Sequence, residues 1–98
     1  MFPRRLVDPR EWRAIVTRAR VNLKTAHLRL RQGERQFTEV EILSLVYRPQ
    51  KVEEEFRPMH ANQVRAFRLG RGRFRCWLCI DFHGWIVIKS MVNDRVTI

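Results

Sequence analysis

The sequence predicts an α+β domain in which two or three N-terminal helices pack on one face of a three- to four-stranded antiparallel sheet. Three observations lead to this fold class: helix-start signals fill the first half, apolar and polar residues alternate in the second half, and glycine turns separate the alternating segments. The chain has 98 residues, which suits a single domain over 1–98.

The first predicted helix covers 9–20 and is amphipathic and basic. Asp8 can cap its first turn, Pro9 suits the first helical position, and Glu11 stands where a capping box needs an acid. Trp12 then begins an apolar stripe at helical spacing. We expect that stripe to pack on the core, and the alternative is a helix that meets a partner or a membrane surface.

Two further helices are predicted before the strands. Residues 25–36 form the second, with Thr25 as a candidate cap. The third begins after Thr38, because Thr38 and Glu41 have the spacing of a capping box. It is expected to end near Tyr47, because a proline follows shortly afterwards.

The remainder of the chain predicts strands joined by tight turns. The strongest signal is the alternation over 73–81, which places two sets of side chains on opposite faces. One set contains Phe74, Cys76, Leu78 and Ile80, and the other contains Arg73, Arg75, Trp77, Cys79 and Asp81. The other predicted strands are an acidic edge strand at 52–56, a strand at 64–69 and a closing strand at 85–92.

The charge balance favours a polyanionic partner. Twenty Lys and Arg residues oppose ten Asp and Glu residues, which gives a net charge of +10. No apolar run approaches the roughly 20 residues that cross a bilayer, and no secretory signal is recognised. We therefore expect a cytoplasmic protein with no membrane partner.

Metal and cofactor chemistry finds little support in the sequence. Cys76 and Cys79 form one CxxC pair, but residues three apart on a strand point to opposite faces. No second cysteine pair or histidine cluster completes a zinc site. We expect packing cysteines, no metal and no cofactor.

A basic strand pair is the predicted nucleic-acid-binding surface. Arginines bind phosphates and aromatic rings stack on bases, and the second half of the chain interleaves both. The alternative is a solvated sheet face whose aromatic side chains, Phe67, Trp77 and Trp85, belong to the core. The predicted binding residues are Arg65, Arg68, Arg71, Arg73, Arg75 and Lys89.

One helix face carries the candidate catalytic residues. His27, Arg31 and Arg35 follow one another at intervals of four within the predicted helix 25–36. RNA cleavage without a metal needs a base, an acid and cations that stabilise the crowded phosphate. Histidine and arginine suit these roles, although a surface arginine or a helix histidine is often only structural.

The same residues resemble a known family. The spacing His27-x3-Arg31-x3-Arg35, followed by an aromatic residue, Thr38 and acidic residues, resembles the signature of small domains related to the BrnT-type toxins, within the wider RelE-like fold. The resemblance covers 23–92 and leaves residues 1–20 as an added basic helix. Gly33 and Gln36 depart from the family pattern.

The resemblance implies a ribonuclease toxin that cleaves RNA without metal and is neutralised by an acidic antitoxin protein. His27, Arg31 and Arg35 then carry over as signature positions. Two alternatives remain open. One is a non-enzymatic nucleic-acid-binding protein, or an inhibitor encoded by a mobile element that acts on a nucleic-acid-processing complex. The other is an interaction protein whose basic helix docks on an acidic partner.

Overall fold

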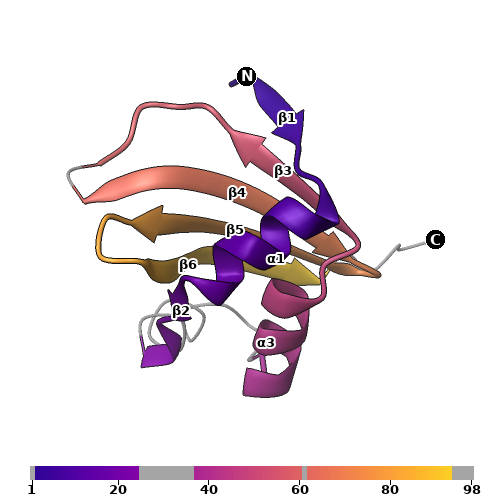
Figure 1. Ribbon diagram of the computed structural model, residues 1–98. Coiled ribbons are helices and arrows are strands. Elements are labelled where there is room, and N and C mark those ends of the chain that lie inside the picture. Colours follow the sequence, from indigo (N-terminus) through magenta and orange to yellow (C-terminus); the bar gives the residue numbers. More distant parts are fainter. Residues whose placement is uncertain (1, 25–36, 61, 94–98) are drawn as a thin grey trace.

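A six-stranded sheet organises the residues that the structure describes, which are 2–24, 37–60 and 62–93. In this computed structural model the strand order is β1-β3-β4-β5-β6-β2, and the helices α1 and α3 lie on the same side of the sheet (Figure 1). The elements are β1 (Arg4–Leu6), α1 (Pro9–Thr17), β2 (Arg20–Val21), α3 (Glu39–Tyr47), β3 (Lys51–Glu55), β4 (Gln63–Arg71), β5 (Phe74–Asp81) and β6 (Trp85–Asn93).

The predicted fold class is wrong, because the number of strands differs from the prediction and strands predominate over helices. A sheet of three or four strands under two or three helices was expected, but six strands and two short helices make up the described part of the chain. The two unpredicted strands, β1 and β2, have three and two residues. Two or three residues are too few to show an alternation of apolar and polar side chains. Such strands are defined by their pairing with the backbone of a neighbouring strand. The predicted helix 25–36 lies outside the described residues.

The acidic strand β3 was also expected at an edge, and this is wrong. β1 pairs antiparallel with β3 on one side, and β4 pairs antiparallel with it on the other. At the opposite end of the sheet β2 runs parallel to β6, with Arg20 opposite Trp85. Short outer strands limit the unpaired backbone that a long edge would expose.

Both helix starts follow from local capping. The Asp8 carboxylate accepts a hydrogen bond from the Arg10 backbone N–H at 2.7 Å, as predicted for α1. At α3 the predicted capping box is confirmed: the Glu41 N–H donates to the Thr38 hydroxyl at 3.1 Å, and the Thr38 N–H donates to the Glu41 carboxylate at 2.9 Å. Neither helix is long and apolar enough to cross a membrane, as judged over the described residues.

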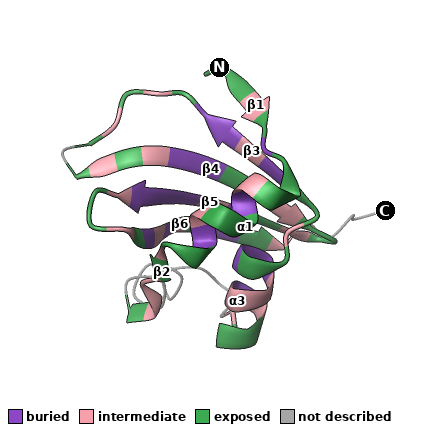
Figure 2. Cartoon of the chain, viewed as in Figure 1, coloured by how far each residue is buried: buried purple, intermediate pink, exposed green. Residues whose placement is uncertain are grey.

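The core lies between the two helices and one face of the sheet (Figure 2). Trp12 of α1 meets Phe67 of β4 edge-to-face, with ring centroids 4.9 Å apart. The Trp12 indole N–H also donates to the Val46 carbonyl at 2.8 Å, which ties α1 to α3. The predicted alternation of β5 is confirmed, because Cys76, Leu78 and Ile80 belong to this core. We call the sheet face that carries Arg75 and Trp77 the open face.

A β-bulge in β6 changes which side chains reach the open face. Trp77 pairs with Ser90 and Leu78 pairs with Ile88, so Lys89 is the extra residue. Before the bulge Ile88 points into the core, and after it Met91 does so. Ser90 is thereby directed to the open face, beside Trp77.

Candidate nucleic-acid interface

The three predicted catalytic residues, His27, Arg31 and Arg35, lie outside the described residues. Their predicted role therefore stays a prediction. What the structure does describe is the environment of the predicted nucleic-acid-binding arginines. These divide into two groups according to whether a carboxylate neutralises them.

The first group, which we call the paired arginines, is bound to the glutamates of β3. Glu54 is only 7% exposed and Glu55 only 4%. Neighbouring residues on a strand point to opposite faces, so Glu54 serves the helix side of the sheet and Glu55 the open face. The paired arginines are Arg5 and Arg65, which donate to Glu54 at distances between 2.8 and 3.1 Å, and Arg57 and Arg68, which donate to Glu55 at 3.1 and 2.6 Å.

These contacts shift the acidity of the glutamates. The hydrogen bonds from Arg65, together with its charge and with Arg5, hold the pKa of Glu54 below its ordinary value. Burial raises the pKa of Glu55, but the hydrogen bonds and charges of Arg68 and Arg57 outweigh burial, so the net shift is downward. Both carboxylates are therefore ionised near neutral pH, and the paired arginines are occupied within the fold.

The turn between β4 and β5 is held against the loop that precedes β3. Gly72 has a φ of +57°, a left-handed conformation that favours glycine. Its backbone N–H donates to the Gln50 side chain at 2.8 Å, and the Arg71 guanidinium donates to the Arg48 carbonyl at 2.7 Å. The Arg75 guanidinium donates to the Gly72 carbonyl at 2.8 Å. This end of the sheet is therefore a defined structure rather than a loose hairpin.

Five cations surround this turn, and we call them the tip cations. All five side chains are exposed. Within the described part of the chain, the only carboxylate within 4.0 Å of any of them is Glu53, which lies 3.8 Å from Lys51. The tip cations are Arg48, Lys51, Arg71, Arg73 and Arg75. They give one end of the sheet a concentration of positive charge that, Lys51 apart, no carboxylate among the described residues neutralises.

The predicted binding residues are thus only partly brought together. Arg71, Arg73 and Arg75 lie among the tip cations. Arg65 and Arg68 are separated by three positions on β4, so they point to opposite faces, and each is held by a glutamate. Lys89 lies half-buried in the bulge of β6.

Two of the tip cations, Arg48 and Lys51, were missed in the sequence. They lie at the end of α3 and the start of β3, about twenty residues before the hairpin. The pairing of Lys51 with Gly70 brings them to the turn. To predict their position at the turn, one would have had to predict that the segment 51–55 pairs with the next strand.

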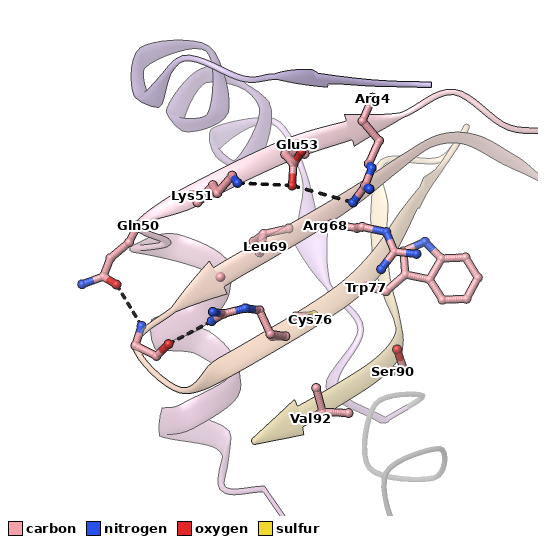
Figure 3. A pocket seen from close by; sticks show the side chains of 13 residues that line it. Arg4, Gln50, Lys51, Glu53, Arg68, Leu69, Cys76, Trp77, Ser90 and Val92 are labelled. Carbon is pink, nitrogen blue, oxygen red and sulfur yellow. Dashed lines mark hydrogen bonds and ion pairs between the residues drawn. The ribbon is translucent and has the colours of Figure 1, made fainter. Parts of the chain in front are cut away.

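A groove runs from the tip cations across the open face (Figure 3). Its volume is about 520 Å³, and its walls come from β1, β3, β4, β5 and β6. Four of its lining side chains are cationic, namely Arg4, Lys51, Arg68 and Arg75, against the single carboxylate of Glu53. We call it the open-face groove.

The three aromatic side chains that were named with the predicted binding surface lie in different parts of the molecule. Phe67 is fully buried in the core. Trp77 lines the open-face groove, and the Arg57 guanidinium lies 4.6 Å from its ring centroid and 4.8 Å from that of Phe2. Trp85 lies at the start of β6, partly exposed, away from the tip cations. One aromatic side chain of the three is therefore associated with the groove.

Metal-ligand geometry is not found among the described residues: no group of three or more His, Cys, Asp and Glu side chains is placed to hold an ion. Cys76 and Cys79 are both buried, as the prediction of packing cysteines requires, and neither forms a disulfide within the described residues. Burial raises the pKa of the Cys76 thiol to about 12, so it is not a nucleophile near neutral pH.

With this geometry established, comparisons with known proteins add nothing to it. No family model, curated protein or solved structure matches the chain. Function is therefore inferred from the tip cations and the open-face groove.

Proposed function

We propose that this protein binds nucleic acid, with RNA as the expected ligand, through the tip cations. One observation carries the proposal: β3 glutamates occupy the paired arginines, whereas the tip cations are exposed and, Lys51 apart, have no carboxylate within ion-pair distance in the described chain. Because these cations surround one turn, several of them can contact the phosphates of one strand at once. We further propose that the protein acts in the cytoplasm.

The residue type suits phosphate better than it suits a general acidic surface. Four of the five tip cations are arginines, whose planar fork matches two phosphate oxygens and stays charged at any physiological pH. They surround a turn that projects at the end of two paired strands, so phosphates can approach from more than one side. The net charge of +10 adds long-range attraction for a polyanion.

The test is the affinity for a labelled RNA oligonucleotide in a variant that lacks three tip cations. This tip triple variant carries Arg71→Gln, Arg73→Gln and Arg75→Gln. We expect it to bind at least about tenfold more weakly than the wild type at low salt, because each lost phosphate contact lowers the affinity. Fluorescence anisotropy measures the effect directly.

The matched control removes the same charge elsewhere. It carries Arg10→Gln, Arg18→Gln and Arg20→Gln, three exposed arginines in and just after α1. We call it the control triple variant and expect its affinity to fall no more than about two- to threefold, through net charge alone. Equal losses in the two triple variants would contradict a localised site.

Ribonuclease activity in a toxin–antitoxin pair remains a separate proposal, because it depends on His27, Arg31 and Arg35. Incubation of the protein with RNA in the presence of a chelator should give cleavage that His27→Ala and Arg31→Ala abolish. If the protein binds the RNA and the RNA stays intact, the ribonuclease proposal fails and the non-enzymatic nucleic-acid-binding alternative is favoured. An acidic antitoxin is expected to compete with RNA if it covers the tip cations.

The inhibitor alternative differs in its ligand. A protein that blocks a nucleic-acid-processing complex would bind that complex stoichiometrically, and the tip cations would occupy its nucleic-acid path. Tight binding to such a complex, together with weak binding to free RNA, would identify the complex as the ligand and exclude RNA from this role.

A further inference from the structure

Besides the open-face groove, a second groove reaches the tip cations, on the helix side of the sheet between the start of α1 and the end of α3 (Figure 1). Its volume is about 820 Å³, which lies within the range of about 300–1,000 Å³ that is usual for small-ligand sites. Four cations line it, namely Arg13 of α1 and the tip cations Arg48, Lys51 and Arg71. We call it the helix-side groove.

Tyr47, the last residue of α3, adds an aromatic ring to the lining of this groove. The helix buries Ile42, Leu45 and Val46 in the core. Successive residues of a helix are turned by about 100°, so Tyr47, one position further along, is turned away from the core and is 47% exposed. A ligand in the groove can therefore reach the ring directly.

The positive charge of the groove lies next to this ring. Arg48 follows Tyr47 in the chain, and the Arg71 guanidinium donates to the Arg48 carbonyl at 2.7 Å, which brings its charge to the end of α3. The single carboxylate of the lining, Asp8, caps α1 by accepting from the Arg10 N–H. The occupant that suits this lining combines a flat apolar ring with a nearby negative charge.

Hydrogen bonds between elements hold the walls of the helix-side groove in place. The bond from the Trp12 indole to the Val46 carbonyl joins α1 to α3. The Val7 N–H donates to the Val52 carbonyl at 2.9 Å, which joins the segment before α1 to β3. A groove whose walls are already fixed loses little conformational entropy when a ligand binds.

We propose that the helix-side groove binds one unpaired nucleotide of a single strand, whose base stacks on Tyr47 and whose phosphate contacts Arg48 and Arg71. One sugar joins base and phosphate in a nucleotide, so a ring and guanidinium groups that lie close together can contact both at once. Stacking on an aromatic ring accepts any base, because every base has a π face. This inference rests on the proposed function and deepens it, since it makes a single strand the preferred ligand: the bases of a duplex are stacked on one another.

The test compares a single-stranded RNA oligonucleotide with an abasic oligonucleotide, which has the same sugar–phosphate backbone and charge but no bases. In the variant Tyr47→Leu an apolar side chain remains and the ring is gone. We expect its affinity for the RNA to fall at least about fivefold, and its affinity for the abasic oligonucleotide to equal that of the wild type. Equal losses for the two oligonucleotides would overturn the proposal, because the ring would then act through the fold and not through a base.

Two further variants are the controls. Tyr47→Phe keeps the ring and loses only the hydroxyl, so it should bind the RNA within about twofold of the wild type. Phe82→Leu removes an exposed ring at the opposite end of the sheet and should change neither affinity. A loss as large as that of Tyr47→Leu in either control would overturn base stacking on Tyr47.

The two proposals fail in different ways. If the tip triple variant loses affinity for the RNA while Tyr47→Leu loses none, the nucleotide site alone is overturned, and a protein segment becomes the alternative occupant of the groove. If the tip triple variant binds the RNA like the wild type, the proposed function is overturned as well. A wild-type protein that binds a blunt RNA duplex more tightly than the single strand would also overturn the nucleotide site.

Discussion

Glu54 and Glu55 are neighbours on β3, yet they act on opposite faces of the sheet. Glu54 joins β1, β3 and β4 on the helix side, where Arg5 also bonds Glu11 of α1 at 2.6 Å. Glu55 fixes two paired arginines on the open face. Glu54 and Glu55 therefore hold the four paired arginines within the fold.

Removal of the Glu54 charge should destabilise the protein. We expect Glu54→Gln to lower the free energy of unfolding by about 1–3 kcal/mol, because two arginines lose the carboxylate that they share. Urea denaturation measures the change. The matched control is Glu53→Gln on the same strand, whose ion pairs with Arg4 and Lys51 are 3.9 and 3.8 Å long. A loss as large in Glu53→Gln would contradict the special role of Glu54.

Acid should weaken the same contacts. The pKa values of Glu11, Glu54 and Glu55 lie below the ordinary 4.5 in the folded protein. Their stabilisation is therefore complete above about pH 4.5 and is lost as the pH falls through the lower folded values. The urea concentration at the midpoint of unfolding should decrease as the pH is lowered below about 4.5. The decrease should be less steep in Glu54→Gln. A midpoint that stays constant down to pH 3 would contradict this account.

Helices and strands with a local sequence signal could be predicted, whereas the pairing of strands with one another could not. The capping box of α3 and the alternation of β5 depend on residues close together in the chain, and both were predicted correctly. β1 exists because its backbone pairs with β3, which local periodicity cannot reveal. The glutamates of β3 suggested an exposed edge, but their arginine partners lie far away in the sequence.

The α3 cap offers a test of one such local signal. Thr38→Ala removes the hydroxyl that accepts from the Glu41 N–H, and we expect a loss of about 1 kcal/mol in the free energy of unfolding. Thr17→Ala is the control, because the Thr17 hydroxyl only donates to the Arg13 carbonyl within α1. Thermal denaturation should separate the two variants. A Thr38→Ala protein as stable as Thr17→Ala would show that packing, rather than capping, fixes the start of α3.

Across the whole molecule the two ends of the sheet differ in chemistry. The tip cations lie where β4 ends and β5 begins. The opposite end, where β4 and β6 begin, exposes the apolar side chains Val64, Phe82 and Trp85. Three of the tip cations, Arg71, Arg73 and Arg75, were named from the predicted hairpin, and their binding to nucleic acid stays a prediction. The division between paired arginines and tip cations needed the positions of Glu54 and Glu55.

The salt dependence of RNA binding tests the central claim most directly, because the slope of log affinity against log salt counts phosphate contacts. Each contact to a single strand contributes about 0.7 to the slope. We predict that the tip triple variant has a slope shallower than the wild type by about 2, while the control triple variant keeps the wild-type slope. An unchanged slope in the tip triple variant would contradict phosphate binding at this end of the sheet.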